Sequence, residues 1–142
     1  QNEGNKYNQS AYFREVLSTL GMGLEDRMKT KIGLLSGGQR QAASLLMATI
    51  AEPELLLLDE HTAALDPGAA EKVMALTKKI VEENKITTLM ITHDMEYALE
   101  YGSRTIMLDS GKIVMDLTGK EREEMTTGKL AELFYGKAHK KG

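Results

Sequence analysis

The sequence predicts an α/β domain, and three observations lead to that fold class. Two short apolar runs, at residues 55–58 and 87–92, have the length and composition of buried strands. Between them lies a segment with apolar residues at helical spacing, which begins at Asp66 and Pro67. A strand, a helix and a second strand in this order favour a mostly parallel sheet with flanking helices, because parallel strands need a long crossover.

Two helices are predicted ahead of the first strand. Apolar residues that recur on one face indicate the first helix, and Gly21 is placed to end it; they are Tyr12, Phe13, Val16, Leu17 and Leu20. Residues 22–35 are expected to form a short helical segment and a loop. Ser36 can cap the second helix, which runs to about Ile50. Its expected buried stripe consists of Ala42, Leu45, Leu46 and Thr49.

The first strand and the helix after it form the expected centre of the domain. Residues 55–58 are all leucine, and a strand that is apolar on both faces is typical of a parallel sheet covered on both sides. Asp66 and Pro67 suit the cap and the first turn of the following helix. The buried stripe of that helix is expected to contain Ala69, Val73, Leu76 and Ile80.

Shorter elements are predicted after the second strand. A short helix is expected at about residues 95–101. Two further strands, at residues 104–108 and 113–117, flank the turn sequence Asp-Ser-Gly-Lys at residues 109–112 and so indicate a hairpin. A final helix is expected at about residues 127–135.

The composition is that of an ordinary globular protein. The 142 residues suit one domain or part of one, and 42% hydrophobic and 27% charged residues are usual values. The net charge of −3 disfavours a nucleic-acid partner, which usually requires a basic face. The absence of cysteine excludes a disulfide framework. No run approaches the ~18 consecutive apolar residues of a membrane-spanning helix.

Ser36, Gly37 and Gly38 form a candidate anion site at the start of the second predicted helix. The N-terminus of a helix presents free N–H groups and the positive end of the helix dipole. Glycine lets an anion approach the backbone without a Cβ in the way. The alternative for such a sequence is a flexible helix cap without a ligand.

Polar residues with possible chemistry follow each of the two apolar runs. Asp59 and Glu60 come directly after the first run, and His93 follows the second. In α/β sheets, ligands bind outside the carboxyl ends of the strands. The alternatives are a strand that leaves the core into solvent and a hydrogen-bonded histidine at a strand end. No function is predicted for His61 from the residues around it.

The order and spacing of four motifs resemble the nucleotide-binding domain of ABC transporters. Residues 35–41, Leu-Ser-Gly-Gly-Gln-Arg-Gln, resemble the signature motif. The leucine run that ends in Asp59 and Glu60 resembles the Walker B strand with its catalytic glutamate. Residues 64–66, Ala-Leu-Asp, resemble the D-loop, and residues 91–94, Ile-Thr-His-Asp, resemble the H-loop. The resemblance covers roughly residues 10 to 135.

The resemblance implies a role for each site residue. The signature residues are expected to contact the γ-phosphate of an ATP held by the opposite subunit; they are Ser36, Gly37, Gly38 and Gln39. Asp59 is expected to organise Mg²⁺, mostly through its water, and Glu60 to act as general base on the attacking water. His93 is expected to bond the γ-phosphate, and Asp66 to lie at the dimer seam. His61 occupies a place where the family commonly has proline.

The phosphate-binding loop of the family is absent from this sequence. That loop needs Gly, four residues, and then Gly-Lys followed by Ser or Thr. Gly-Lys occurs four times, but the next residues are Ile113, Glu121, Leu130 and Ala138. The resemblance therefore implies the C-terminal part of a P-loop NTPase fold of ABC type, incomplete without its N-terminal half and inactive when isolated.

The implied division of the chain has four parts. Residues 1–9 are expected to be a disordered or frayed N-terminus, and residues 10–50 a remnant of the helical subdomain with the signature helix. Residues 51–136 are expected to form the C-terminal part of the ATPase core, and residues 137–142 a basic tail that contains His139.

The function implied by the resemblance is that of an ATP-hydrolysing subunit of an ABC transporter. The expected cofactors are ATP and Mg²⁺. The expected partners are a second ATPase subunit, transmembrane permease subunits and the missing N-terminal half of the domain, without nucleic acid. The expected location is cytoplasmic, at the inner face of the cell membrane. The alternatives are a non-catalytic half-domain that acts as an interaction module, and an ABC-type head of a DNA-repair or translation-associated protein.

Overall fold

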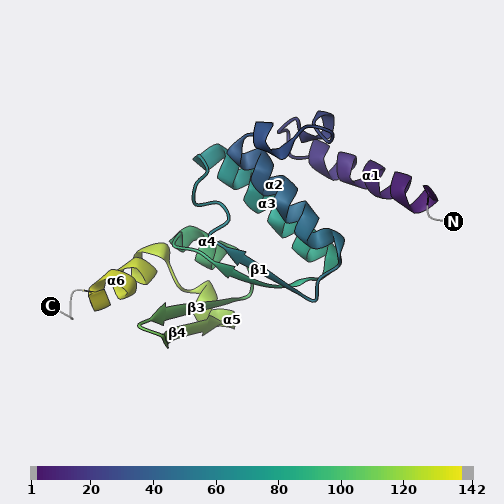
Figure 1. Ribbon diagram of the computed structural model, residues 1–142. Helices are drawn as coiled ribbons and strands as arrows, with labels where there is room; N and C mark the ends of the chain where they lie inside the picture. Colours follow the sequence, from purple (N-terminus) through teal and green to yellow (C-terminus); the bar gives the residue numbers. More distant parts are fainter. Residues whose placement is uncertain (1–2, 139–142) are drawn as a thin grey trace. The chain divides into compact units, whose positions relative to one another are not determined.

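A computed structural model describes the backbone of residues 3–138 and the side chains of residues 10–136 (Figure 1). The chain divides into two compact units, Gln1–Met90 and Ile91–Gly142. His139 and most of the expected basic tail lie outside the described residues.

The first unit contains four helical elements before its first strand. They are α1 (Glu3–Ser18), the 3₁₀ helices η1 (Leu24–Asp26) and η2 (Ile32–Leu34), and α2 (Gly37–Ile50). Strand β1 (Leu55–Asp59), helix α3 (Pro67–Asn84) and strand β2 (Thr87–Ile91) follow. The mixture of strands and helices confirms the predicted α/β class.

The start of helix α1 differs from the sequence prediction. Residues 1–9 are expected to be frayed, whereas α1 already begins at Glu3. The helix ends at Ser18, and Gly21 lies in the turn after it with a φ of 61°. Because this left-handed backbone region is favourable for glycine, Gly21 marks the end of the helical segment as predicted.

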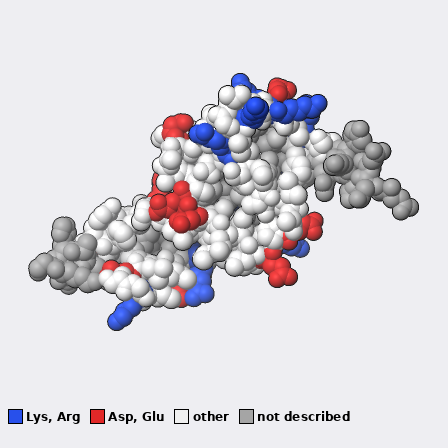
Figure 2. Space-filling view, viewed as in Figure 1, with Lys and Arg blue, Asp and Glu red and all other residues white. Residues whose placement is uncertain are grey.

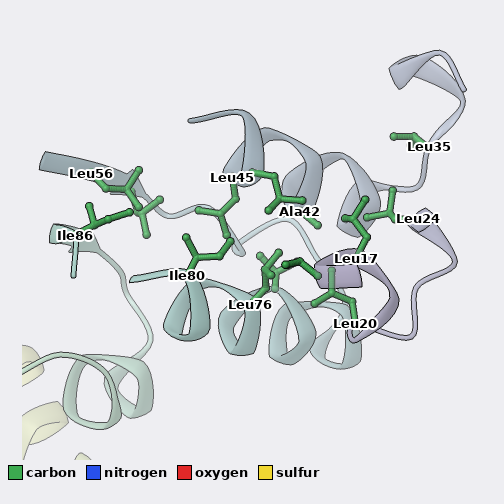
Figure 3. Packing of buried hydrophobic residues seen from close by; sticks show 14 residues of the cluster. Leu17, Leu20, Leu24, Leu35, Ala42, Leu45, Leu56, Leu76, Ile80 and Ile86 are labelled. Carbon is green, nitrogen blue, oxygen red and sulfur yellow. The ribbon is translucent and has the colours of Figure 1, made fainter. Parts of the chain in front are cut away.

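Helices α1, α2 and α3 meet in one hydrophobic cluster (Figure 3). Leu45 and Ala42 of α2 face Leu76 and Ile80 of α3, and Leu17 of α1 lies at the other end of the group. The predicted stripes are largely confirmed, although Thr49 and Ala69 are half-buried and the neighbouring Ala70 is buried. The buried members are Val16, Leu17, Leu20, Leu24, Leu35, Ala42, Leu45, Leu46, Leu56, Leu58, Val73, Leu76, Ile80 and Ile86.

Strands β1 and β2 form a two-stranded parallel sheet connected through α3. The burial of β1 alternates: Leu56 and Leu58 are 5% and 8% exposed, whereas Leu55 and Leu57 are 53% and 65% exposed. The prediction that this strand is buried on both faces is therefore wrong for the described residues. Successive side chains of a strand point to opposite faces, and only the face with Leu56 and Leu58 joins the hydrophobic cluster.

The second unit contains the predicted hairpin between two helices. Its elements are α4 (Met95–Glu100), β3 (Arg104–Asp109), β4 (Lys112–Thr118), α5 (Gly119–Glu123) and α6 (Thr127–Ala138). Strands β3 and β4 pair antiparallel. Ser110 and Gly111 both have positive φ, at 51° and 76°, which is typical of the two-residue turns that connect hairpin strands. Helix α5 was not predicted from the sequence.

Arg122 of α5 connects three elements of the second unit. Its Nε donates a hydrogen bond to Thr105 Oγ1 of β3 at 2.9 Å, and its Nη2 donates to the carbonyl of Tyr101 at 2.7 Å. Tyr101 is the C-cap of α4, so the guanidinium lies where the helix dipole favours a positive charge. Arg122 thus explains how the short helix α5 is held against α4 and the hairpin.

Charged side chains are dispersed over the face of the molecule in Figure 2. Lys and Arg lie in several small groups, with Asp and Glu between them, and this view of the described residues contains no continuous basic face. Among the described helices, none has the length and apolarity that crossing a bilayer requires.

Candidate functional site

The signature segment (residues 35–41) forms the start of helix α2, and Ser36 is its N-cap. Ser36 Oγ accepts a hydrogen bond from the backbone N–H of Gln39 at 3.1 Å. In return, Gln39 Oε1 accepts one from the backbone N–H of Ser36 at 3.0 Å. This reciprocal pair is a capping box, and it fixes the direction in which the chain enters the helix.

Both polar atoms of the Gln39 side chain form hydrogen bonds within the chain. Besides the capping box, its Nε2 donates a hydrogen bond of 2.7 Å to the carbonyl of Met22. The polar groups that can still face an anion include the exposed hydroxyl of Ser36, the second amide hydrogen of Gln39 and first-turn N–H groups, including that of Gly37, which have no partner within the helix. The structure therefore indicates that Gln39 shapes the segment.

Gly38 is buried between the helices. A Cβ at this position would lie 2.8 Å from Met22 Cε and 3.1 Å from Ala69 Cβ of α3. At Gly37, a Cβ would lie 3.4 Å from Leu65 Cδ2. The two glycines thus bring the signature segment against residues 64–66 and the start of α3, so the structure places two of the four predicted motifs side by side.

Asp66 is the N-cap of helix α3. Its Oδ2 accepts a hydrogen bond from the backbone N–H of Ala69 at 3.1 Å, and Pro67 follows in the first turn. The side chain is exposed, which leaves the second carboxylate oxygen accessible to solvent or to a partner. The predicted capping role is confirmed, and the predicted place at a dimer seam stays a prediction.

The carboxylate turn (residues 59–65) begins at the carboxyl end of β1. Asp59 is the last residue of the strand and is exposed, and Glu60 is half-buried. Glu60 has a φ of 48°, in the left-handed region, where a residue other than glycine costs roughly 1–2 kcal/mol. Two backbone hydrogen bonds shape the rest of the turn, from Ala63 N to Glu60 O and from Leu65 N to Thr62 O, both at 3.1 Å.

His61 is anchored to helix α3. Its Nε2 lies 3.0 Å from Thr77 Oγ1, and the Thr77 hydroxyl donates its only hydrogen to the carbonyl of Val73 at 2.8 Å. With its hydrogen directed to Val73, the Thr77 hydroxyl can accept a hydrogen bond from the tautomer of His61 that is protonated on Nε2. Burial lowers the pKa of His61, which favours the neutral ring at neutral pH. This contact could not be predicted from the sequence, because Thr77 is 16 residues away.

His93 lies in the second unit, after the end of β2, and is exposed. The residue after it, Asp94, caps α4 by accepting a hydrogen bond from Tyr97 N at 3.1 Å. Asp94 N also donates to Thr92 Oγ1 at 3.0 Å, so the chain on both sides of His93 is held by a local turn. The expected bond of His93 to the γ-phosphate stays a prediction.

The carboxylates of the first unit can offer a metal ion only a few ligands. Within residues covered by the structure, no three His, Asp or Glu side chains converge as a complete metal site. Asp59 offers one exposed carboxylate. This donor set fits Mg²⁺, which usually keeps several waters and takes one or two carboxylates together with phosphate oxygens of a substrate.

Comparison with known proteins identifies the class of this domain. The sequence profile of the ABC transporter family matches residues 1–63. The chain is 49% identical over 119 residues to a tyrosine transport ATP-binding protein of Clostridioides difficile, covering 84% of this chain and 47% of the relative. It is 38% identical over 109 residues to a phosphonates import ATP-binding protein of Halalkalibacterium halodurans, covering 77% of this chain and 45% of the relative.

A third relative is named for the transport of a different substrate. The chain is 41% identical over 100 residues to a spermidine/putrescine import ATP-binding protein of Mycoplasmopsis synoviae, covering 70% of this chain and 22% of the relative. These relatives are named as ATP-binding proteins of transport systems, and the chain belongs to the ABC transporter family. It spans about half the length, or less, of these relatives.

Proposed function

We propose that this chain supplies the signature segment and the catalytic carboxylates of an ATP-hydrolysing subunit in an ABC importer. One observation is the main support for the proposal. Asp59 and Glu60 stand at the carboxyl end of β1, and the same unit contains the capped signature helix packed against residues 64–66. Ligand sites in α/β folds form at this end of the strands.

Each residue has a distinct part in the proposed reaction. Glu60 acts as general base and takes a proton from the water that attacks the γ-phosphate. Asp59 holds Mg²⁺, mostly through its water. The hydroxyl of Ser36 and first-turn N–H groups of α2 bind the γ-phosphate of an ATP held by a second subunit. His93 bonds the γ-phosphate of the ATP bound by its own subunit, and Gln39 keeps the signature segment in shape.

The proposal assigns the phosphate-binding loop to residues outside this sequence. Without that loop most of the positioning and charge stabilisation of phosphoryl transfer is lost. We therefore expect the isolated chain to be inactive. The exposed face of the β1–β2 sheet, with Leu55, Leu57 and Leu89, suits contact with the rest of the domain, because apolar surfaces of this kind are normally covered.

The proposed partners follow from the same class. They are a second ATPase subunit that completes the site and transmembrane permease subunits that hold the protein at the inner face of the membrane. Uptake is proposed as the direction, because the relatives are named for import of phosphonates and of spermidine or putrescine. Their names differ in cargo, so the proposal concerns ATP-driven uptake and no particular substrate.

The test is the rate of ATP hydrolysis by the complete protein with Glu60→Gln. We expect turnover to fall at least ~100-fold, because general-base catalysis contributes about 10²–10⁴ in rate. Glu52→Gln is the matched control, since Glu52 is another glutamate with a positive φ, 49°, and is exposed. That variant should retain the full rate. Unchanged hydrolysis by Glu60→Gln would contradict the proposal.

A second candidate function is a non-catalytic interaction module. The exposed apolar face of the β1–β2 sheet favours it, because a binding module needs such a surface. Adding a separately produced N-terminal half of the domain distinguishes the two functions. Restored ATP hydrolysis supports the catalytic function, whereas stable binding without hydrolysis supports the module.

A further inference from the structure

We infer that His61 is a positioning residue that holds Glu60 in place through its hydrogen bond to Thr77. This inference rests on the proposed role of Glu60 as general base. His61 does not itself touch the reacting atoms in this account. It acts on the backbone turn from which the glutamate side chain extends.

The backbone of Glu60 requires support from its surroundings. Its φ of 48° is in a region that non-glycine residues rarely adopt, and such conformations persist only where neighbouring contacts determine them. The hydrogen bond from Ala63 N to Glu60 O closes the turn on its C-terminal side. That local bond shapes the turn but does not itself connect it to helix α3.

The contact between His61 and Thr77 connects the carboxylate turn to helix α3. Nε2 of His61 lies 3.0 Å from Thr77 Oγ1, and Thr77 is only 5% exposed. The Thr77 hydroxyl is oriented by its own bond to the carbonyl of Val73, so its lone pairs face the histidine. His61 is the residue directly after Glu60, and fixing its side chain therefore restricts the backbone at which the strained φ occurs.

The anchor itself lies on a rigid part of the molecule. The neighbours of Thr77 along α3, Val73 and Leu76, are 0% and 1% exposed and belong to the hydrophobic cluster. The start of α3 is fixed separately by the Asp66 cap. The carboxylate turn is thus connected to α3 both through the chain and through His61. The family commonly has proline at the position of His61. The proline ring restricts its own backbone angle φ but offers no hydrogen bond to α3.

The experiment compares steady-state ATP hydrolysis by variants of the complete protein. His61→Phe keeps an aromatic ring of similar size without a donor, and Thr77→Val keeps the shape of the threonine without the acceptor. We expect each to lower kcat about 10-fold while the KM for ATP changes less than twofold, because small misplacements of a catalytic group reduce kcat strongly. The double variant should be no slower than either single variant.

Conservative variants and controls separate positioning from a general loss of structure. His61→Gln and Thr77→Ser keep a donor and an acceptor and should restore at least half of kcat. Thr49→Val is the matched control, since the Thr49 hydroxyl also bonds a helix carbonyl, that of Leu46 at 2.9 Å, and should leave kcat unchanged. Thermal unfolding of each variant verifies that the folded state persists at the assay temperature.

Glu60→Gln, measured in parallel, separates this inference from the proposed function. If Glu60→Gln abolishes turnover and His61→Phe leaves kcat unchanged, the inference is wrong and the proposed function stands. If Glu60→Gln retains turnover, both are wrong. A loss of kcat in His61→Phe that the glutamine variant does not restore, or losses that add in the double variant, would also overturn the positioning role.

Discussion

The signature segment forms the start of helix α2 and the carboxylate turn lies directly before helix α3, but different kinds of bond hold them. In the signature segment, Ser36 and Gln39 are three residues apart and cap each other. In the carboxylate turn, Glu60 adopts a strained backbone and His61 reaches a partner 16 residues away. The cap of the signature segment is therefore local, whereas the contact that anchors the carboxylate turn depends on the packed helix α3.

Gly38→Val is expected to give the largest change in the stability of the signature segment. Even the Cβ would approach Ala69 Cβ to 3.1 Å and Met22 Cε to 2.8 Å, and valine adds two methyl groups. Overpacking of this kind costs about 2 kcal/mol, partly offset by the better helix propensity of valine over glycine. Urea unfolding of the chain measures the difference in the free energy of unfolding.

Gly33→Val is the control for that substitution. Gly33 lies in the 3₁₀ helix η2, and a Cβ there would meet no atom within 4 Å. Its free energy of unfolding should change by less than about 0.5 kcal/mol, as for other surface substitutions. Equal losses in the two variants would show that close packing does not determine the shape of the signature segment.

Gln39→Ala is expected to have a smaller effect on stability. It removes the acceptor for Ser36 N and the donor to the carbonyl of Met22, and the lost cap and tether should cost about 1 kcal/mol. Gln41→Ala, two residues further along the same helix, should cost less than about 0.5 kcal/mol. A loss for Gln39→Ala no greater than for Gln41→Ala, measured by the same unfolding, would contradict the role given to the Gln39 side chain.

The same comparison explains which parts of the molecule the sequence could predict. Ser36 predicts the start of α2, and Asp66 with Pro67 predicts the start of α3, because capping is local chemistry. The two-residue hairpin turn was predicted for the same reason. Helix α5 was missed because its position depends on Arg122, which bonds residues from two other elements.

Burial and tertiary contacts were less predictable. The four leucines of β1 indicated burial on both faces, but Leu55 and Leu57 are exposed because no described element of the first unit covers them. No role could be predicted for His61 from the sequence, since neither its contact with Thr77 nor the φ of Glu60 can be recognised without the folded backbone. The candidate residues themselves were recognised from motif order, whereas the contacts that position them required the structure.

In the proposed function, this chain supplies one side of an ATP site, and residues outside this sequence supply the phosphate-binding loop. Titration of the purified chain with Mg²⁺ and a fluorescent ATP analogue tests it most directly. We expect no saturable binding of the nucleotide by this chain up to millimolar concentration. Saturable micromolar binding that is lost on Asp59→Asn would contradict it, because the chain would then form a phosphate site of its own.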